Sequence, residues 1–109
     1  MNKRNELIYI SHPYGGDDGN LRKTETDVTY YRAKNPHTLP ISPVLMWRKL
    51  YYMLPYEDGL EMCLDLLSRC DRLHLCKGWQ ASRGCMAEWA FAVAKGIPIE
   101  YEEGEDDEV

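Results

Sequence analysis

The sequence predicts an α/β protein in which a mainly parallel sheet of four to five strands is covered by helices on both faces. Short runs of β-branched and aromatic residues alternate along the chain with longer segments whose apolar residues recur at helical spacing. The connections are short, which favours right-handed crossovers between parallel strands. Because the 109 residues contain no repeat or low-complexity linker, we expect one domain over residues 1–101 and an acidic tail over residues 102–109.

The first half of the chain predicts two strands around one helix. The run ELIYIS favours a strand at residues 7–11, which ends at the glycine-rich turn HPYGGDDGN. Apolar residues at helical spacing then predict a helix from about residue 20 to about residue 34. The segment TLPISPV, residues 38–44, contains two prolines and therefore suits a short strand at the sheet edge.

The second half of the chain predicts three helices and two strands. The helices are expected at residues 44–54, 57–70 and 83–95, and the strands at residues 72–76 and 97–101. Pro55 ends the first of these helices and Gly96 ends the last. The segment GWQAS, between the strand at residues 72–76 and the helix at residues 83–95, is interpreted as a loop.

Charge and hydropathy argue against large polyanionic or lipid partners. The net charge of −5 disfavours binding to nucleic-acid backbones. No apolar run approaches the roughly 20 residues of a membrane-spanning helix, and the N-terminus lacks a signal-peptide core. We therefore expect a cytoplasmic protein whose partner is a small molecule, with neither nucleic acid nor membrane as a partner.

The cysteines give no metal-binding pattern along the chain. None of Cys63, Cys70, Cys76 and Cys85 forms a C-x-x-C pair, and no histidine lies at ligand spacing from them. Reduced, buried thiols are the simpler interpretation in a cytosolic protein. We expect no metal site and no cofactor.

Two loops are expected to bind a ligand. In an open parallel sheet, ligands bind beyond the carboxyl ends of the strands where the strand order reverses, and the loops HPYGGDDGN and KGWQASRG leave strands there. The candidate ligand-binding residues are Ser11, His12, Pro13, Tyr14, Gly15 and Gly16 in the first region and Gly78, Trp79, Ser82, Arg83 and Gly84 in the second. The alternatives are that the Gly-Gly pair only serves a tight turn and that Trp79 packs over a core edge instead of stacking on a ring.

Ser82 precedes a predicted helix and has two compatible interpretations. Its hydroxyl could cap a free backbone N–H as an ordinary N-cap residue. The same helix end presents the unpaired amides of Arg83, Gly84 and Cys85, which favours an anion such as phosphate.

Glu88 is the only acidic residue between Asp71 and Glu100. No lysine or arginine lies three or four residues away to pair with it along the helix. The small residues Gly84 and Ala92 share its helical strip and are expected to leave open surface beside the carboxylate. The alternative is a solvent-facing helix glutamate.

Three segments carry a resemblance to a known family. YISHPYGG, ISPV and CDRLHLCKGWQASRGCMAEWAFAVAKGIPI together resemble the nucleoside 2-deoxyribosyltransferase-like superfamily, most closely its small DUF4406-type members. The resemblance covers residues 7–101 and implies a Rossmann-like (flavodoxin-like) three-layer sandwich. It also implies a homo-oligomer, a dimer or higher.

The resemblance assigns roles to individual residues. It implies that Glu88 is the catalytic nucleophile at an N-glycosidic bond and that Tyr9 positions it. Serine at position 82 resembles the nucleotide-hydrolase branch, whereas the transferases of free nucleosides have an aspartate there; this agrees with the separate helix-terminus argument for phosphate. Cys63 replaces the aspartate that protonates the leaving base in the family's enzymes, and HPYGG lacks the arginine of the related phosphate loop.

These observations predict a protein that binds a nucleotide or nucleoside-like ligand and cleaves or exchanges its N-glycosidic bond through Glu88. The alternative, favoured by Cys63, is a binding module of the same fold that holds a nucleotide derivative without cleaving it. A third class, a structural interaction protein, would leave Glu88 paired and both loops packed shut.

Overall fold

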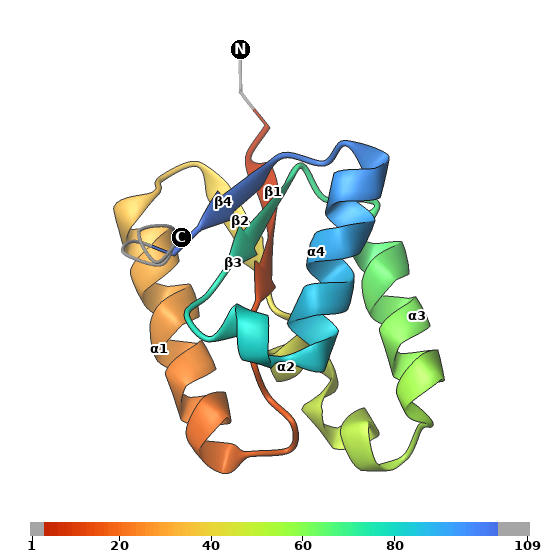
Figure 1. Cartoon of the computed structure of the whole chain (residues 1–109). Coiled ribbons are helices and arrows are strands. Elements are labelled where there is room, and N and C mark those ends of the chain that lie inside the picture. Colours follow the sequence, from red (N-terminus) through yellow and green to blue (C-terminus); the bar gives the residue numbers. More distant parts are fainter. Residues whose placement is uncertain (1–3, 103–109) are drawn as a thin grey trace.

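A computed structural model describes residues 4–102 and contains one parallel sheet. The strands are β1 (Glu6–Ser11), β2 (Thr38–Ile41), β3 (Arg72–Leu75) and β4 (Ile99–Tyr101). Their spatial order is β2-β1-β3-β4, and every adjacent pair is parallel (Figure 1). The predicted α/β class with a parallel sheet is confirmed, at four strands.

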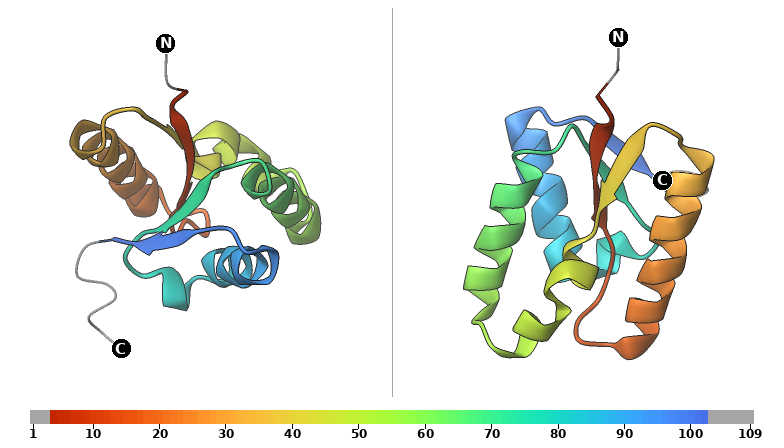
Figure 2. Two further views of the ribbon diagram at one scale, coloured as in Figure 1. Left: turned by 90° about the horizontal axis from the view of Figure 1, so that it is seen from above. Right: turned by 180° about the vertical axis from the view of Figure 1, so that it is seen from behind.

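The helices cover both faces of this sheet. Helix α1 (Asp18–Lys34) lies on one face, while α3 (Tyr56–Leu67) and α4 (Arg83–Lys95) lie on the other (Figure 2). This arrangement follows from the strand order, because the chain moves from β1 to β2 in one direction and then reverses to reach β3 and β4. Right-handed crossovers in opposite directions place their helices on opposite faces. The result is the three-layer Rossmann-like sandwich that was expected.

The N-terminus of α1 lies two residues before its predicted start. The side chain of Asp17 accepts hydrogen bonds from the backbone N–H groups of Gly19 and Asn20, at 2.6 and 3.4 Å. An aspartate N-cap of this kind satisfies donors that the first helical turn leaves free. The helix therefore begins at Asp18, inside the segment that was interpreted as a loop.

The helix predicted at residues 44–54 is wrong as a single element. The segment forms a short helix α2 (Pro43–Trp47) followed by a 3-10 helix η1 (Arg48–Tyr52). The break lies at Trp47, whose φ of −122° and ψ of 22° leave the α-helical region. Helix α3 likewise ends at Leu67 rather than residue 70, and a 3-10 turn η2 (Trp79–Ala81) occupies part of the predicted GWQAS loop.

Two apolar clusters lie on opposite faces of the sheet, and β1 contributes to both. Ile8 and Ile10 pack with α1, whereas Tyr9 belongs to the cluster on the α3 and α4 side. Successive side chains of a strand point to opposite faces. Ser11 consequently points to the α4 side, and His12, one residue later, lies against Asp27 of α1.

The carboxyl ends of β1 and β3 form the point at which the strand order reverses. The two strands are joined there by a hydrogen bond of 3.0 Å from the Cys76 N–H to the Ser11 carbonyl. Both predicted binding loops leave the sheet at this edge, as expected. Among residues 4–102, no helix combines the length and apolar character that crossing a membrane requires.

Candidate functional site

Glu88 is held by two hydroxyl groups from the end of β1. The Tyr9 hydroxyl donates a hydrogen bond of 2.5 Å to Oε2, and the Ser11 hydroxyl donates one of 2.7 Å to Oε1. Glu88 is only 8% exposed, so the solvent-facing alternative is wrong. The two strand residues therefore fix the orientation of a buried carboxylate on α4.

Burial changes the acidity of this carboxylate. Desolvation raises the pKa of Glu88 from 4.5 to about 7, against the opposing effect of the hydrogen bonds from Ser11 and Tyr9. Both protonation states are consequently populated near neutral pH. The ionised form can act as a nucleophile and the protonated form as an acid, and a carboxyl poised near neutrality suits either task.

Cys63 of α3 lies beside this carboxylate. Burial, followed by the proximity of Glu88, raises the pKa of the Cys63 thiol to about 11, while a hydrogen bond with Tyr9 lowers it. The thiol is therefore neutral at neutral pH and is a weak proton donor. Glu61 and Asp65, the acidic residues two positions to either side of Cys63, are both exposed, and Asp65 pairs with Arg69 at 3.2 Å.

Ser82 is the N-cap of α4, as predicted. Its hydroxyl oxygen accepts a hydrogen bond of 3.2 Å from the Cys85 N–H. Arg83, the first residue of the helix, is exposed, and its guanidinium carbon lies 4.0 Å from the centroid of the Tyr56 ring. Ser82 and Glu88 therefore lie at the beginning and the middle of one helix, with a stacked arginine at its N-terminus.

The strip of small residues beside Glu88 is open at one end only. A Cβ atom built on Gly84 meets no atom within 4 Å. Ala92, by contrast, is fully buried in the core cluster, so the expectation of open surface there is wrong. Helix α4 packs against α3 and β3 on that side, which closes it. Any approach to Glu88 along the strip runs past Gly84.

The loop after β1 is fastened by the 3-10 helix η1. Tyr14 packs edge-on against Tyr51 with ring centroids 5.3 Å apart, and the Tyr52 hydroxyl donates a hydrogen bond of 3.0 Å to the Gly16 carbonyl. Gly15 and Gly16 have positive φ values of 58° and 80°. A Cβ on Gly16 would lie 2.8 Å from the Tyr52 hydroxyl oxygen, so this close approach requires glycine.

Trp79 packs in the core rather than in an open loop. It is 8% exposed and lies between Trp89 and Tyr101, with ring centroids 5.9 and 5.8 Å away. Gly78 opens the turn that carries it, with a φ of 87°. Stacking of Trp79 on a ligand ring would require the indole to leave this cluster.

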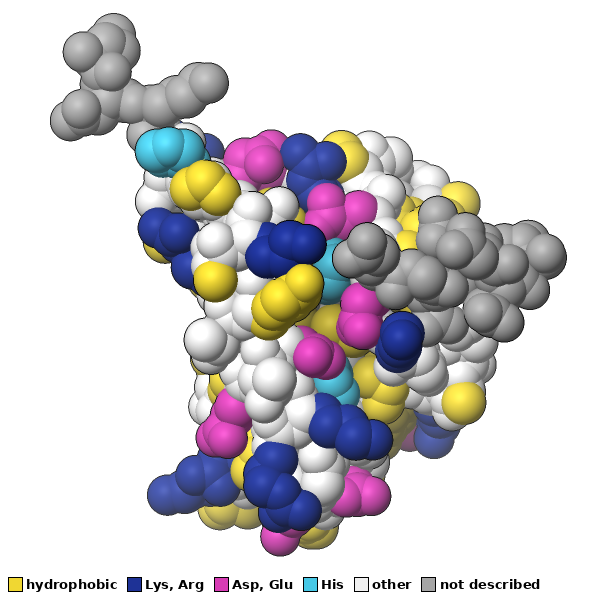
Figure 3. All heavy atoms as spheres, turned by 90° about the vertical axis from the view of Figure 1, so that its left-hand side faces the viewer, with side chains coloured by type: hydrophobic (Ala, Val, Ile, Leu, Met, Phe, Trp, Pro, Cys, Tyr) yellow, Lys and Arg dark blue, Asp and Glu magenta, His cyan; other side chains and the backbone are white. Residues whose placement is uncertain are grey.

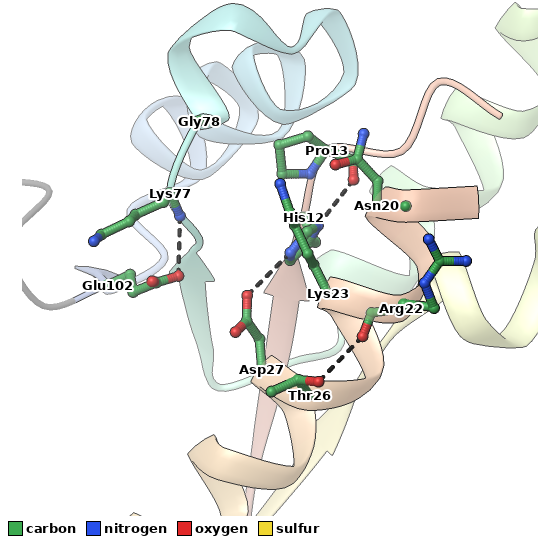
Figure 4. A pocket seen from close by; sticks show the side chains of 11 residues that line it. His12, Pro13, Asn20, Arg22, Lys23, Thr26, Asp27, Lys77, Gly78 and Glu102 are labelled. Carbon is green, nitrogen blue, oxygen red and sulfur yellow. Dashed lines mark hydrogen bonds and ion pairs between the residues drawn. The ribbon is translucent and has the colours of Figure 1, made fainter. Parts of the chain in front are cut away.

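A second region lies at the same sheet edge on the α1 side. It is an open cavity of about 730 Å³. Figure 3, which views the molecule from the α1 side, shows basic, acidic and histidine side chains gathered along a hollow in this face. The charged and polar residues that line it are His12, Asn20, Arg22, Lys23, Thr26, Asp27, Lys77 and Glu102, with Pro13, Gly19 and Gly78 completing the wall (Figure 4).

The two regions do not share the catalytic candidate. Glu88 is not among the residues that line the cavity. Of the predicted ligand-binding residues, His12, Pro13 and Gly78 line it, while Ser11 contacts Glu88 on the other face. Sequence reasoning missed Asp27 and Lys23, because charged residues on a helix are usually interpreted as a solvated face and nothing in their spacing says otherwise.

The sheet order and the two crossover directions define a doubly wound α/β protein with a carboxylate held at the switch point. Within that class, the chain belongs to the family described as "Domain of unknown function (DUF7768)", whose model matches residues 6–102. The matching family is thus DUF7768, in place of the DUF4406-type proteins that the motifs suggested. No curated protein matches the sequence.

One solved structure with a similar fold is a 2-desoxiribosyltransferase from Leishmania mexicana. The two structures superpose with a TM-score of 0.63 over 88% of this chain, at 16% sequence identity. The chain spans 63% of the length of that protein, which is less than two thirds. At this identity the similarity shows a common Rossmann-like fold.

Proposed function

We propose that this protein binds a nucleoside or nucleotide and cleaves or exchanges its N-glycosidic bond with Glu88 as the nucleophile. The observation that carries the proposal is the pair of hydrogen bonds from Tyr9 and Ser11 to the Glu88 carboxylate. A nucleophile must be held in one orientation to reach the anomeric carbon. The similarity of fold to a 2-desoxiribosyltransferase supports this substrate class.

The proposed reaction has two displacement steps. A Glu88 carboxylate oxygen forms an ester bond to the anomeric carbon as the C–N bond breaks, and the base leaves with the bonding electron pair and takes up a proton. Water, or the nitrogen of a second base, then attacks the anomeric carbon and releases Glu88. Tyr9 and Ser11 each donate one hydrogen, so the carboxylate keeps lone pairs for the attack.

The phosphate of a nucleotide is assigned to the N-terminus of α4. The Ser82 hydroxyl and the N–H groups of Arg83 and Gly84 provide donors there, whereas the Cys85 N–H, which was expected to be unpaired, already donates to Ser82 Oγ. Helix N-termini favour anions. Glu88 lies six residues further along the helix, roughly 9 Å at 1.5 Å per residue. That span is comparable to the distance from a 5′-phosphate to the anomeric carbon.

A second candidate function is a module that holds a nucleotide derivative without cleaving it. The observation that favours it is Cys63, whose thiol stands beside Glu88 with a pKa of about 11. A departing nucleobase needs a proton, and such a thiol supplies it poorly. The two candidates share the binding site and differ only in chemistry.

We also propose that a second copy of the chain helps to close the site. The exposed apolar side chains Met46, Tyr51, Tyr52 and Met53 gather in α2, η1 and the residue after them, next to Tyr56. Tyr52 and Met53 are each 73% exposed. Apolar surface of this kind is typical of an interface between protein chains.

The deciding experiment combines a panel of nucleosides and 5′-nucleotides with Glu88→Gln and mass spectrometry. Wild type is expected to release free base, and Glu88→Gln is expected to retain intact ligand with nearly unchanged affinity, because the amide preserves the shape and an acceptor for Tyr9. Asp65→Asn changes an exposed carboxylate of α3 and is the matched control.

Each outcome separates the candidates. Base release by wild type and Asp65→Asn but not by Glu88→Gln supports the glycosidic reaction. Intact ligand recovered from all three proteins supports the binding module. If none of the three proteins releases free base or retains a ligand, both candidate functions are contradicted.

A further inference from the structure

Three potential metal ligands from three separate elements meet behind the cavity on the α1 side. They are His12 after β1, Asp27 of α1 and Cys76 after β3, and their ligand atoms all lie within 4.8 Å of one another. His12 and Asp27 line the cavity, whereas Cys76 is only 1% exposed and lies behind them. The cluster thus has a buried side and an open side.

The hydrogen bonds of His12 point to a cation at this position. Its Nδ1 lies 2.8 Å from the Pro13 carbonyl oxygen and its Nε2 lies 3.0 Å from Asp27 Oδ2 (Figure 4). Both neighbours are acceptors, whereas a neutral imidazole has only one N–H to donate. The side chain of His12 is 4% exposed, so water does not resolve the mismatch. A metal ion between Nε2 and the carboxylate would leave the single ring N–H at Nδ1, where the Pro13 carbonyl accepts it.

The arrangement matches the second shell of a metal-bound histidine. Such a histidine donates its other ring N–H to a carbonyl or carboxylate, which fixes the tautomer and the ring plane. The Pro13 carbonyl occupies that place at Nδ1. Nε2 is then left with its lone pair directed at Asp27 and toward the cluster.

The donor set and the spacing select the metal. One thiolate sulfur, one imidazole nitrogen and one carboxylate oxygen suit Zn²⁺ and disfavour Mg²⁺ or Ca²⁺, which prefer oxygen ligands. Tetrahedral zinc with bonds of about 2.0–2.3 Å places its ligand atoms roughly 3.3–3.6 Å apart. Atoms that already lie within 4.8 Å need to move on the order of 1 Å to reach that geometry.

We propose that His12, Asp27 and Cys76 bind a zinc-type divalent cation, with a fourth coordination position open to the cavity. Binding displaces the thiol proton and any second proton on the imidazole, so metal uptake releases acid. Arg22, Lys23 and Lys77 also line this cavity and make it partly basic. That position therefore suits water or an anionic group.

The test is a Co²⁺ titration of tag-free, reduced, chelator-treated protein, followed by displacement with Zn²⁺. Tetrahedral Co²⁺ reports a bound thiolate through its charge-transfer absorption. Wild type is expected to develop this band at stoichiometric metal and lose it on addition of Zn²⁺. Cys76→Ser should abolish the band, and Asp27→Asn should weaken binding at least about tenfold, the lower end of the effect of changing even an outer-shell partner.

The controls isolate the cluster. Cys70→Ser removes a half-buried thiol outside it, and Asp65→Asn removes an exposed carboxylate of α3; both should bind Co²⁺ as wild type does. Asp27 is one-third exposed, so its variant stays folded even if Cys76→Ser does not. The proposal is overturned if wild type gives no thiolate band, or if Asp27→Asn binds as tightly as wild type. Since Glu88 lies outside the cluster, either result leaves the glycosidic proposal to its own test.

Discussion

The two faces of the sheet at the carboxyl end of β1 place a carboxylate in opposite environments, one buried and one partly exposed. On the α4 side, Glu88 is buried, receives hydrogen bonds from two neutral hydroxyls and has a raised pKa of about 7. On the α1 side, Asp27 is one-third exposed and faces a histidine at the rim of an open, charged cavity. Side chains alternate between the faces of the sheet along β1 and into the residue after it, so Tyr9 and Ser11 serve a buried site on one face while His12 serves a solvent-exposed site on the other.

Introducing a proton donor beside Glu88 should have the largest effect, on the rate of base release. Cys63→Asp places a second carboxyl group beside Glu88, and burial with a like charge keeps one of the two protonated. If the site lacks only a general acid, base release should rise by about 10²- to 10⁴-fold, the usual contribution of such a group. Steady-state measurement of free base over the nucleotide panel gives the answer.

Cys63→Asn is the matched control for that substitution, since it has nearly the same shape and no acidic proton. A gain with Cys63→Asp alone identifies proton donation as the missing step. Equal rates for both variants would show that the thiol is not what limits the reaction, and the non-cleaving module would then be favoured.

Burial of Glu88 should make stability depend on pH. The folded pKa of about 7 lies above the unfolded value near 4.5, so the folded state holds the proton more tightly. Its contribution is complete below the unfolded pKa and is lost as pH rises through about 7. Between about pH 5 and about pH 8, wild type should lose on the order of 2–3 kcal/mol of unfolding free energy that Glu88→Gln does not lose.

Urea unfolding of both proteins at the two pH values measures this difference. Glu61→Gln, which changes an exposed glutamate of α3, should follow wild type at both. A wild-type curve parallel to that of Glu88→Gln would mean that the carboxylate is not desolvated as the structure implies.

Ser82→Ala tests whether the phosphate of a nucleotide binds at the N-terminus of α4 or in the cavity on the α1 side. Ser82→Ala should weaken 5′-monophosphates relative to nucleosides by roughly 1.5–3 kcal/mol, the range of a hydrogen bond to a charged group. Calorimetric titration of both ligand types measures it, with Lys23→Gln in the cavity as the comparison. Equal losses for nucleosides and nucleotides return Ser82 to a plain helix cap, and a selective loss in Lys23→Gln would move the phosphate to the α1 side.

The sequence predicted an element correctly where residues within that element determine its ends. Helix α4 has its predicted bounds because Ser82 caps its start and Gly96, with a φ of 73°, ends it. The segment from Pro43 to Tyr52 could not be predicted as broken, because its conformation depends on distant contacts, including that of Tyr52 with the Gly16 carbonyl. Periodicity alone carries no information about such contacts.

The sequence likewise predicted one part of the candidate site and missed another. The unusual isolation of Glu88 in the sequence marked it, and the contact with Tyr9 that the resemblance implied is present. The cluster of His12, Asp27 and Cys76 gave no signal, because its members come from three elements and have no ligand spacing along the chain. Only the parallel sheet, which aligns the ends of β1 and β3 beside α1, brings them together.

The smallest predicted effect completes the comparison, since the same change of carboxylate to amide should have the opposite sign on the α1 side. Asp27→Asn removes the charge that faces His12 at 3.0 Å. In the presence of a chelator it should lower the unfolding free energy at neutral pH by about 1 kcal/mol or less, because a polar contact with one partly exposed member is screened by solvent. Glu88→Gln should raise stability under the same conditions, since it removes a desolvated carboxylate that is partly ionised. Paired urea curves for the two variants decide the matter, and a gain of stability in Asp27→Asn would show that Asp27 is held against its preference, as a ligand awaiting a cation would be.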